Sequence, residues 1–147
     1  MVNTHEDMNM PEMNMNKVWF TSDLHFGHSK IIEYCEQRRH FNNILEHDNT
    51  LVDNINSCVK KDDTLWIVGD VSFTKQGLEC VAALNGIKKI VLGNHDKFSA
   101  QIYNGIKGVR AKLYGVGEHR GCVLTHVPVH PNQLESRYKL NIHGHMH

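Results

Sequence analysis

The sequence has no long apolar run and no excess of either charge. None of its apolar stretches approaches the ~20 residues of a membrane-spanning helix, and the N-terminus lacks the apolar core of a secretion signal. Sixteen basic residues balance sixteen acidic ones, so nucleic acid is not indicated as a partner. We therefore expect a cytoplasmic protein without membrane contact, and the sequence leaves its oligomeric state open.

Closely spaced cysteines are also absent. The four cysteines are far apart, form no CxxC pair and fall in segments predicted to be helices or strands: Cys35, Cys58, Cys80 and Cys122. This spacing indicates reduced core residues, which agrees with a cytoplasmic protein.

The length of 147 residues leaves room for one domain, which can bury on the order of 70% of its unfolded surface. Residues 1–16 alternate Met and Asn with acidic residues and Pro11 and have neither helical nor strand periodicity. We expect them to be a disordered N-terminal extension, with Met15 as an alternative start. Residues 17–147 form the predicted domain.

Short apolar stretches alternate with helical patterns in the first two thirds of this domain. The predicted strands cover residues 17–21, 64–68 and 88–92, and the predicted helices cover residues 29–39, 43–60 and 76–84. Ser29 is a predicted N-cap, and Asn43 with Glu46 forms a predicted capping box. Such alternation indicates βαβ units in a largely parallel sheet. After residue 105 the pattern changes to short strands, at 109–114, 121–124 and 139–142, with little helix.

Polar motifs stand directly after five of these strands. They are Asp23-Leu24-His25, Gly69-Asp70, Gly93-Asn94-His95-Asp96, Thr125-His126 and Gly144-His145-Met146-His147. Ligands of open α/β sheets bind outside the carboxyl ends of the strands, so one crevice can collect all five motifs. Asp and neutral His are usual ligands of divalent metals, and residues i and i+2 of an extended segment share a face. The predicted metal ligands are Asp23, His25, Asp70, Asn94, His126, His145 and His147. We expect Gly69, Gly93 and Gly144 to let the chain turn sharply as it leaves each strand.

Seven candidate ligands exceed the needs of one tetrahedral site and therefore indicate two ions. Asp70, in the middle of the set, is the natural bridge between them. Two ions ~3.5–4 Å apart lower the pKa of a shared water and clamp the oxygens of an in-line displacement at phosphorus. We therefore expect phosphoester hydrolysis by a metal-bridging hydroxide. Mn²⁺ is the expected ion because the ligands include no thiolate, with Zn²⁺, Fe or Ni²⁺ as alternatives.

Three further roles follow from positions near these ligands. His95, next to Asn94, is the predicted general acid for the leaving group, and Asp96 is predicted to orient its imidazole. Asn94 and His28 are the predicted substrate-binding residues. For His28 the sequence leaves two roles open. One is contact with a metal ligand or with the substrate phosphate, and the other is purely structural.

Together, the five motifs resemble the calcineurin-like metallophosphoesterase superfamily over about residues 17–147. Within it, the segments 22–28 (SDLHFGH), 68–70 (VGD) and 84–86 (LNG) are similar to those of small bacterial and phage phosphoesterases. The resemblance implies a four-layer αββα sandwich and His95 as the catalytic acid. It also implies that Asp23, His25, Asp70 and His147 hold a first metal and that Asp70, Asn94, His126 and His145 hold a second.

Two features depart from the family pattern. The protein phosphatases carry an Arg shortly after Gly-Asp, whereas this chain has Val71-Ser72-Phe73-Thr74-Lys75, which disfavours phosphoprotein substrates. Relatives continue past Gly-His-x-His with further strands, so we expect a fold that lacks its final C-terminal strands.

The leading expectation is an enzyme acting on a small or nucleotide-like phosphomonoester or phosphodiester. The alternatives are an inactive or truncated binding module of this fold, or a nuclease, which the neutral charge disfavours.

Overall fold

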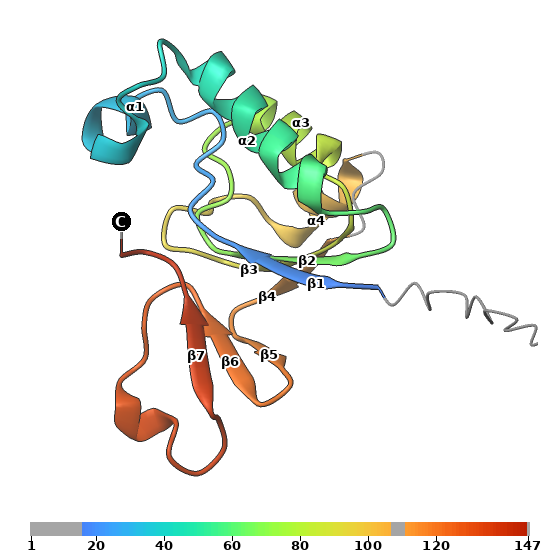
Figure 1. Ribbon diagram of the computed structural model, residues 1–147, viewed down its shortest axis with the longest axis vertical. Helices are drawn as coiled ribbons and strands as arrows, with labels where there is room; N and C mark the ends of the chain where they lie inside the picture. Colours follow the sequence, from blue (N-terminus) through green and yellow to red (C-terminus); the bar gives the residue numbers. More distant parts are fainter. Residues whose placement is uncertain (1–15, 107–110, 147) are drawn as a thin grey trace, which may run out of the picture.

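A computed structural model of the protein describes residues 16–106 and 111–146. Within these residues, seven strands form two sheets (Figure 1). The strands are β1 (Val18–Thr21), β2 (Thr64–Val68), β3 (Ile87–Val91), β4 (Ala111–Tyr114), β5 (Gly117–His119), β6 (Cys122–Thr125) and β7 (Leu140–His143). The α-helices are α1 (Ile31–Tyr34), α2 (Ile44–Cys58), α3 (Lys75–Ala83) and α4 (Ala100–Gly105), and the 3₁₀ helices are η1 (Glu36–Arg38) and η2 (Pro131–Gln133).

The first sheet is fully parallel, as the alternation of strands and helices predicts. Its strand order is β1-β2-β3-β4, and the register aligns Thr21 with Ile67 and Ile67 with Ile90. The loops that follow β1, β2 and β3 therefore leave the sheet at the same edge. In the second sheet β5 pairs antiparallel with β6, and β6 pairs parallel with β7.

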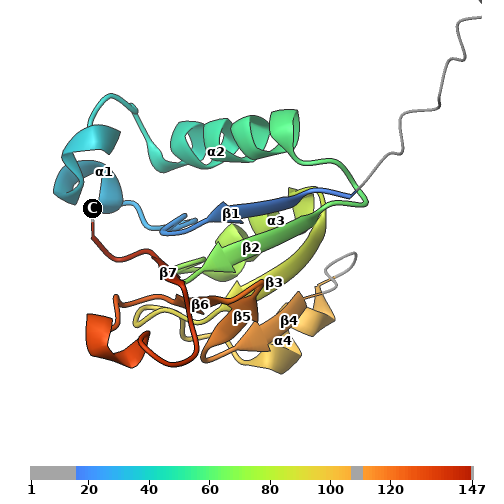
Figure 2. The same ribbon diagram turned by 60° about the horizontal axis from the view of Figure 1, so that its bottom comes forward.

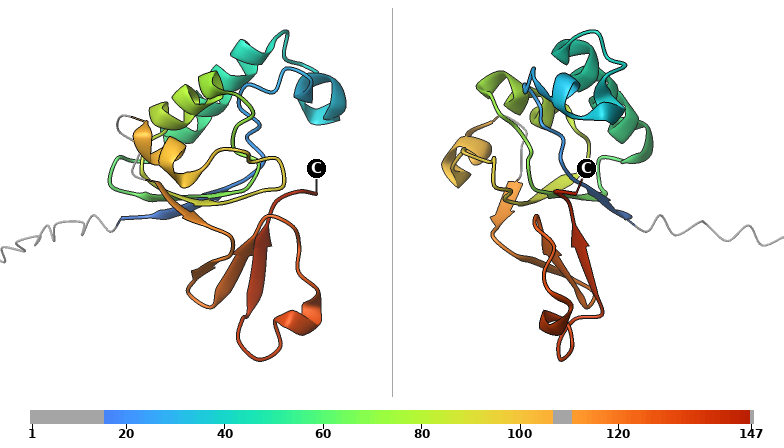
Figure 3. Two further views of the ribbon diagram at one scale, coloured as in Figure 1. Left: turned by 180° about the vertical axis from the view of Figure 1, so that it is seen from behind. Right: turned by 90° about the vertical axis from the view of Figure 1, so that its left-hand side faces the viewer.

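The two sheets and the helices lie in three layers (Figures 1 and 2). Helices α2 and α3 cover one face of the first sheet, and the second sheet lies on its other side (Figure 3). A large apolar core, including Ile67, Val81 and Ile90, lies within the first sheet and its helices, and a smaller one of Trp66, Val68, Val91 and Leu124 brings the two sheets together. The described chain has no α-helix after α4, so the fourth layer of the expected sandwich is not among the described residues.

Helix α2 begins where the sequence predicts. The Asn43 side chain accepts a hydrogen bond from the Glu46 backbone N–H at 2.9 Å, which satisfies one free donor of the first turn. The return half of the predicted capping box differs, because the Glu46 carboxylate accepts from the Asn42 backbone N–H at 3.0 Å and not from that of Asn43. No helix of the described chain is long and apolar enough to span a bilayer.

The prediction of a helix over residues 29–39 is wrong in its length and its start. Helix α1 covers four residues, and its N-cap is Lys30, not Ser29. Cys35 is extended, with φ −100° and ψ 113°, and breaks the helix before the separate turn η1. The short elements α4 and β5 lack a clear periodic pattern, and the sequence does not predict them. The predicted strand at 109–114 is confirmed from Ala111 onward, and its first two residues lie outside the described part.

The expectation of four core cysteines is confirmed in part. All four are free thiols, and Cys35 is buried, whereas Cys58 at the end of α2 is exposed. Burial raises the pKa of the Cys80 thiol to about 11, so little reactive thiolate forms at neutral pH.

Asp63 fastens the amino-terminal edge of the first sheet, opposite to the strand ends that carry the motifs. Its Oδ1 accepts from the Lys17 backbone N–H at 2.7 Å. Its Oδ2 accepts from the Lys60 backbone N–H at 3.0 Å and from the Trp19 indole N–H at 2.9 Å. These hydrogen bonds, that of Lys60 first, hold the pKa of Asp63 below its usual value.

We predict that Asp63→Asn lowers the midpoint of thermal unfolding by several degrees at pH 7, because an amide has one accepting oxygen for three donors. A carboxylate with a lowered folded-state pKa stabilises the fold above its unfolded pKa and loses that contribution as the pH falls through the folded value. The difference between wild type and variant should therefore shrink below about pH 4. Calorimetry of both proteins at several pH values measures this difference in the unfolding midpoint. The control is Asp62→Asn, which changes the exposed neighbouring residue. A difference that is constant from pH 7 to pH 3 would contradict the role of the Asp63 charge.

Candidate metal centre

The loops after β1 and β2 run side by side beyond the ends of their strands. The Asp23 backbone N–H donates to the Gly69 carbonyl at 3.0 Å, and the His25 N–H donates to the Asp70 carbonyl at 2.9 Å. The Phe26 N–H continues the series to the Val71 carbonyl at 3.1 Å. This pairing places Asp23, His25 and Asp70 next to one another at the carboxyl edge of the sheet, as the sequence predicts.

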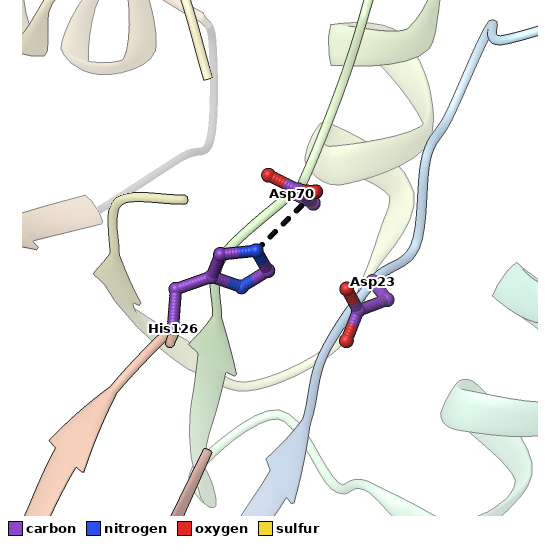
Figure 4. A group of neighbouring side chains, drawn as sticks. All are labelled: Asp23, Asp70 and His126. Carbon is purple, nitrogen blue, oxygen red and sulfur yellow. Dashed lines mark ion pairs between the residues drawn. The ribbon is translucent and has the colours of Figure 1, made fainter. Parts of the chain in front are cut away.

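Side chains from three strand ends converge at this edge (Figure 4). Ligand atoms of Asp23, Asp70 and His126 all lie within 4.8 Å of one another, and all three residues are buried. The His25 Nε2 atom is 3.9 Å from Asp23 Oδ1 and 3.8 Å from Asp70 Oδ2. Four of the seven predicted ligands therefore form one buried cluster.

The orientation of His126 leaves a ring nitrogen for a cation. Its Nδ1 lies 3.1 Å from the Val68 carbonyl oxygen, which only accepts, so Nδ1 carries the hydrogen. In the neutral ring Nε2 then carries a lone pair, and it faces Asp70 Oδ2 at 3.3 Å. Two acceptors at this distance repel each other unless a proton or a metal ion lies with them.

The backbone is strained at the predicted ligands. Asp23, His25, Asp70 and His145 have φ values of 53°, 50°, 51° and 72°, in the left-handed region that non-glycine residues rarely adopt. Such residues cost about 1–3 kcal/mol each, and they cluster at functional sites, where the surrounding structure holds them in place. Within the described chain only one other non-glycine residue, Arg120, has a positive φ.

Three of the motif glycines are required for space. A Cβ on Gly69 would collide with the His126 ring. A Cβ on Gly93 would collide with the Asp70 carboxylate, and one on Gly144 would collide with the Asp23 carboxylate. Gly69 has a positive φ of 85°, whereas Gly93 and Gly144 do not. Gly93 nevertheless opens a turn, since the Asp96 backbone N–H donates to its carbonyl at 3.4 Å. The glycines at 93 and 144 let the backbone pass close behind the two carboxylates.

His145 and His95 reach the cluster through their backbones. The His145 N–H donates to Asp23 Oδ2 at 3.0 Å, and the His95 N–H donates to Asp70 Oδ1 at 3.0 Å. Ring centroids of His145 and His126 are 5.1 Å apart, and those of His95 and His25 are 6.2 Å apart. Both imidazoles therefore border the buried cluster.

The other predicted ligands are placed less closely. Asn94 is exposed in the loop after β3, and its side chain makes no hydrogen bond within the described part of the chain. The predicted ligand His147 lies outside the described residues.

Asp96 does not orient the His95 imidazole, contrary to the sequence prediction. Its Oδ1 accepts from the Val71 backbone N–H and its Oδ2 from the Gly93 backbone N–H, both at 2.8 Å. Burial raises the pKa of Asp96, and the hydrogen bonds from these backbone groups oppose the shift. Asp96 therefore joins the loop after β2 to the loop after β3, and the buried Tyr103 of α4 lies against it.

Phe73 is a residue of this region that the sequence analysis did not assign to the site. Its ring stacks on His28 with centroids 4.0 Å apart and planes 5° apart, and it lies 5.2 Å from the His95 ring and 5.4 Å from the His25 ring. Burial, followed by the electrostatic effect of the nearby His95, lowers the pKa of His28. The only available signal in the sequence is that Phe73 falls within residues 71–75, the segment that departs from the pattern of the protein phosphatases.

The chemistry of the cluster fits divalent cations. Two carboxylates buried side by side are costly without a compensating positive charge. Carboxylate oxygen and neutral imidazole nitrogen are common ligands of Mn²⁺, Zn²⁺ and Fe. Asp23, Asp70 and His126, with His25 beside them, are the described residues best placed to hold such an ion.

The comparisons with known proteins place the chain among phage and archaeal relatives. No family model matches it. The gene 66 protein of Mycobacterium phage L5 is 34% identical over 165 residues, which cover 90% of this chain and 78% of the phage protein. The uncharacterized protein MJ1445 of Methanocaldococcus jannaschii is 34% identical over 148 residues, which cover 92% of this chain and 72% of that protein.

A solved structure supports the fold. The crystal structure of the protein of unknown function AQ665 from Aquifex aeolicus matches with a TM-score of 0.67 and 27% identity, over 90% of this chain and 80% of that chain. The 34% identity over most of their lengths shows that the chain belongs to the family of the phage L5 gene 66 protein and of MJ1445.

Proposed function

We propose that the protein is a metal-dependent phosphoesterase that hydrolyses phosphomonoesters or phosphodiesters with two divalent ions. One observation carries this proposal: ligand atoms of Asp23, Asp70 and His126 lie within 4.8 Å of one another in a buried cluster, and His126 Nδ1 is turned to the Val68 carbonyl, which leaves Nε2 for an ion. The left-handed backbone at three residues of that neighbourhood, Asp23, His25 and Asp70, adds support because such strain collects at functional sites.

In this proposal the predicted ligands divide between two sites that share Asp70. Asp23 and His25 serve the first site, with His147, and His126, His145 and Asn94 serve the second. When bound, two divalent ions lower the pKa of water and neutralise the phosphate oxygens, and Mn²⁺ is the ion that we expect.

The residues at the rim act on the substrate. His95 is exposed, and its backbone is fixed to Asp70, so its imidazole is free to donate a proton to the leaving oxygen as the bond to phosphorus breaks. His28 and Asn94 are the proposed phosphate contacts. Because Phe73 stacks on the His28 ring, we propose that Phe73 positions His28 at this rim.

The architecture supports the proposal as far as it is described. A layer of helices, a parallel sheet and a second sheet agree with three of the four layers that the resemblance to the metallophosphoesterases implies. We propose that the family shares the complete αββα arrangement and that the protein acts in the cytoplasm on small or nucleotide-like phosphoesters.

The direct test is hydrolysis of two chromogenic substrates with added Mn²⁺. Turnover of p-nitrophenyl phosphate or bis-p-nitrophenyl phosphate that chelation abolishes supports the proposal, and the preferred substrate distinguishes monoesterase from diesterase. Turnover of neither, with metal bound, favours the binding-module alternative. Absence of metal binding rejects the proposal.

We predict that wild type binds about two Mn²⁺ ions per chain and that Asp70→Asn weakens both sites by more than 100-fold. Loss of a group that only supports a ligand costs about 10–100-fold in affinity, and Asp70 is proposed to bridge both ions. Isothermal titration calorimetry measures stoichiometry and affinity. The charge-matched control is Asp53→Asn, which changes an exposed residue of α2 and should bind Mn²⁺ as wild type does. Asp70→Asn with unchanged affinity would remove Asp70 from the site.

We predict that His95→Asn retains its metal but loses kcat by about 10²–10⁴-fold on phenyl phosphate. The loss should be smaller on p-nitrophenyl phosphate, because p-nitrophenolate leaves readily without protonation. Steady-state kinetics with both substrates measures the two losses, with the exposed His130→Asn as control. Equal losses on both substrates would show that His95 binds phosphate and is not the acid.

A further inference from the structure

A polar network lies behind the candidate metal centre, on the side of η1 and α2. The Arg38 guanidinium donates to two carbonyl oxygens of the motif segment, those of Asp23 and of Leu24, the latter at 3.2 Å. Its Nη1 also lies 2.8 Å from His47 Nε2. The His47 Nδ1 lies 2.7 Å from Asp48 Oδ1.

The network closes on the far end of the same segment. The Asp48 Oδ2 atom accepts from the Gly27 backbone N–H at 2.8 Å. Residues 23–27 are therefore held at one end by Arg38 and at the other by Asp48, and the His47 ring joins the two. His47 is completely buried, Asp48 is 6% exposed, and Arg38 is half-buried.

The donors and acceptors in this network are unambiguous. Arg38 only donates, so His47 Nε2 must accept and the ring hydrogen must lie on Nδ1. That hydrogen points to the carboxylate of Asp48, which only accepts. His47 is thus a neutral ring in a single tautomer, and none of its nitrogens is left over for another role.

The segment that the network holds is the strained one. Asp23 and His25 are both left-handed, with Leu24 between them. Hydrogen bonds to the loop after β2 fix the N–H groups of Asp23 and His25, but they do not involve the carbonyls of Asp23 and Leu24. Arg38 donates to those two carbonyls, so it opposes relaxation of the segment toward an ordinary extended backbone.

We infer that Arg38, His47 and Asp48 form a clamp that positions Asp23 and His25 for metal binding. The clamp touches neither the substrate nor the buried ligand atoms, and it acts through the backbone of residues 23–27. This inference rests on the metal centre of the proposed function and adds residues to it that none of the strand-end motifs contains.

The test compares Mn²⁺ affinity with stability in the full chain. Arg38→Met removes the donors and keeps the bulk of the side chain, and Arg38→Lys keeps one charged donor group but not the fork. Asp48→Asn breaks the network at its other end, since an amide has one accepting oxygen for two donors, the His47 Nδ1–H and the Gly27 N–H. Matched controls are Arg39→Met, which changes the exposed neighbour, and Asp53→Asn on the exposed side of α2. Asp63→Asn serves as a variant that is destabilised far from the site.

Calorimetric titration is done well below the unfolding midpoint of each variant, where circular dichroism shows all of them folded. We expect Arg38→Met and Asp48→Asn to weaken Mn²⁺ binding by about 10–100-fold, Arg38→Lys to lie between wild type and Arg38→Met, and all three controls to bind as wild type does. If Arg38→Met does not fold, the other two clamp variants give the same comparison.

The outcomes separate the clamp from the proposed function. Clamp variants that are less stable but bind Mn²⁺ within twofold of wild type would show a purely structural network and overturn the inference alone. A wild type that binds no Mn²⁺ would overturn the proposed function and the clamp with it.

Discussion

The arrangement of the candidate site depends on one constraint: the carboxylates of Asp23 and Asp70 are buried close to each other. Each is placed by the end of a parallel strand, and ligand atoms of both lie within 4.8 Å of a ligand atom of His126, all three residues being buried. Charges of the same sign repel strongly in such an environment. Backbone N–H groups of His145 and His95 offset part of this repulsion, but they are dipoles and not charges. A cation among these groups is the simplest way to balance the site.

The surrounding elements serve to hold the two carboxylates in this arrangement. Backbone hydrogen bonds extend the β1–β2 pairing past the strand ends, so the two loops cannot move apart independently. Asp96 joins the loop after β2 to the loop after β3, and Arg38 holds the outer carbonyls of the loop after β1. Gly93 and Gly144 leave room behind the carboxylates. These contacts hold the loops of the candidate site in place, as strained backbone residues require.

The sequence allows the position of the site to be predicted because the relevant signals are local. Apolar strands and the polar residues directly after them can be read within a few positions, and a parallel sheet necessarily brings such ends to one edge. The same reasoning correctly locates the start of α2 at Asn43. It does not reveal the roles of Asp96 or Arg38, because their partners lie 25 and 15 positions away, at Val71 and Asp23. Long-range polar contacts of this kind depend on the details of packing, such as the break at Cys35 that ends α1 and lets η1 turn back toward the site.

In the proposed site, Asp23, Asp70 and His126 hold divalent metal, with Asp70 shared between two ions. Anomalous diffraction from crystals grown with Mn²⁺, recorded on either side of the manganese absorption edge, tests it most directly. We expect two anomalous peaks, both within coordinating distance of Asp70, with one beside Asp23 and the other beside His126. A cluster without an anomalous peak, or peaks only at other places on the molecule, would contradict it.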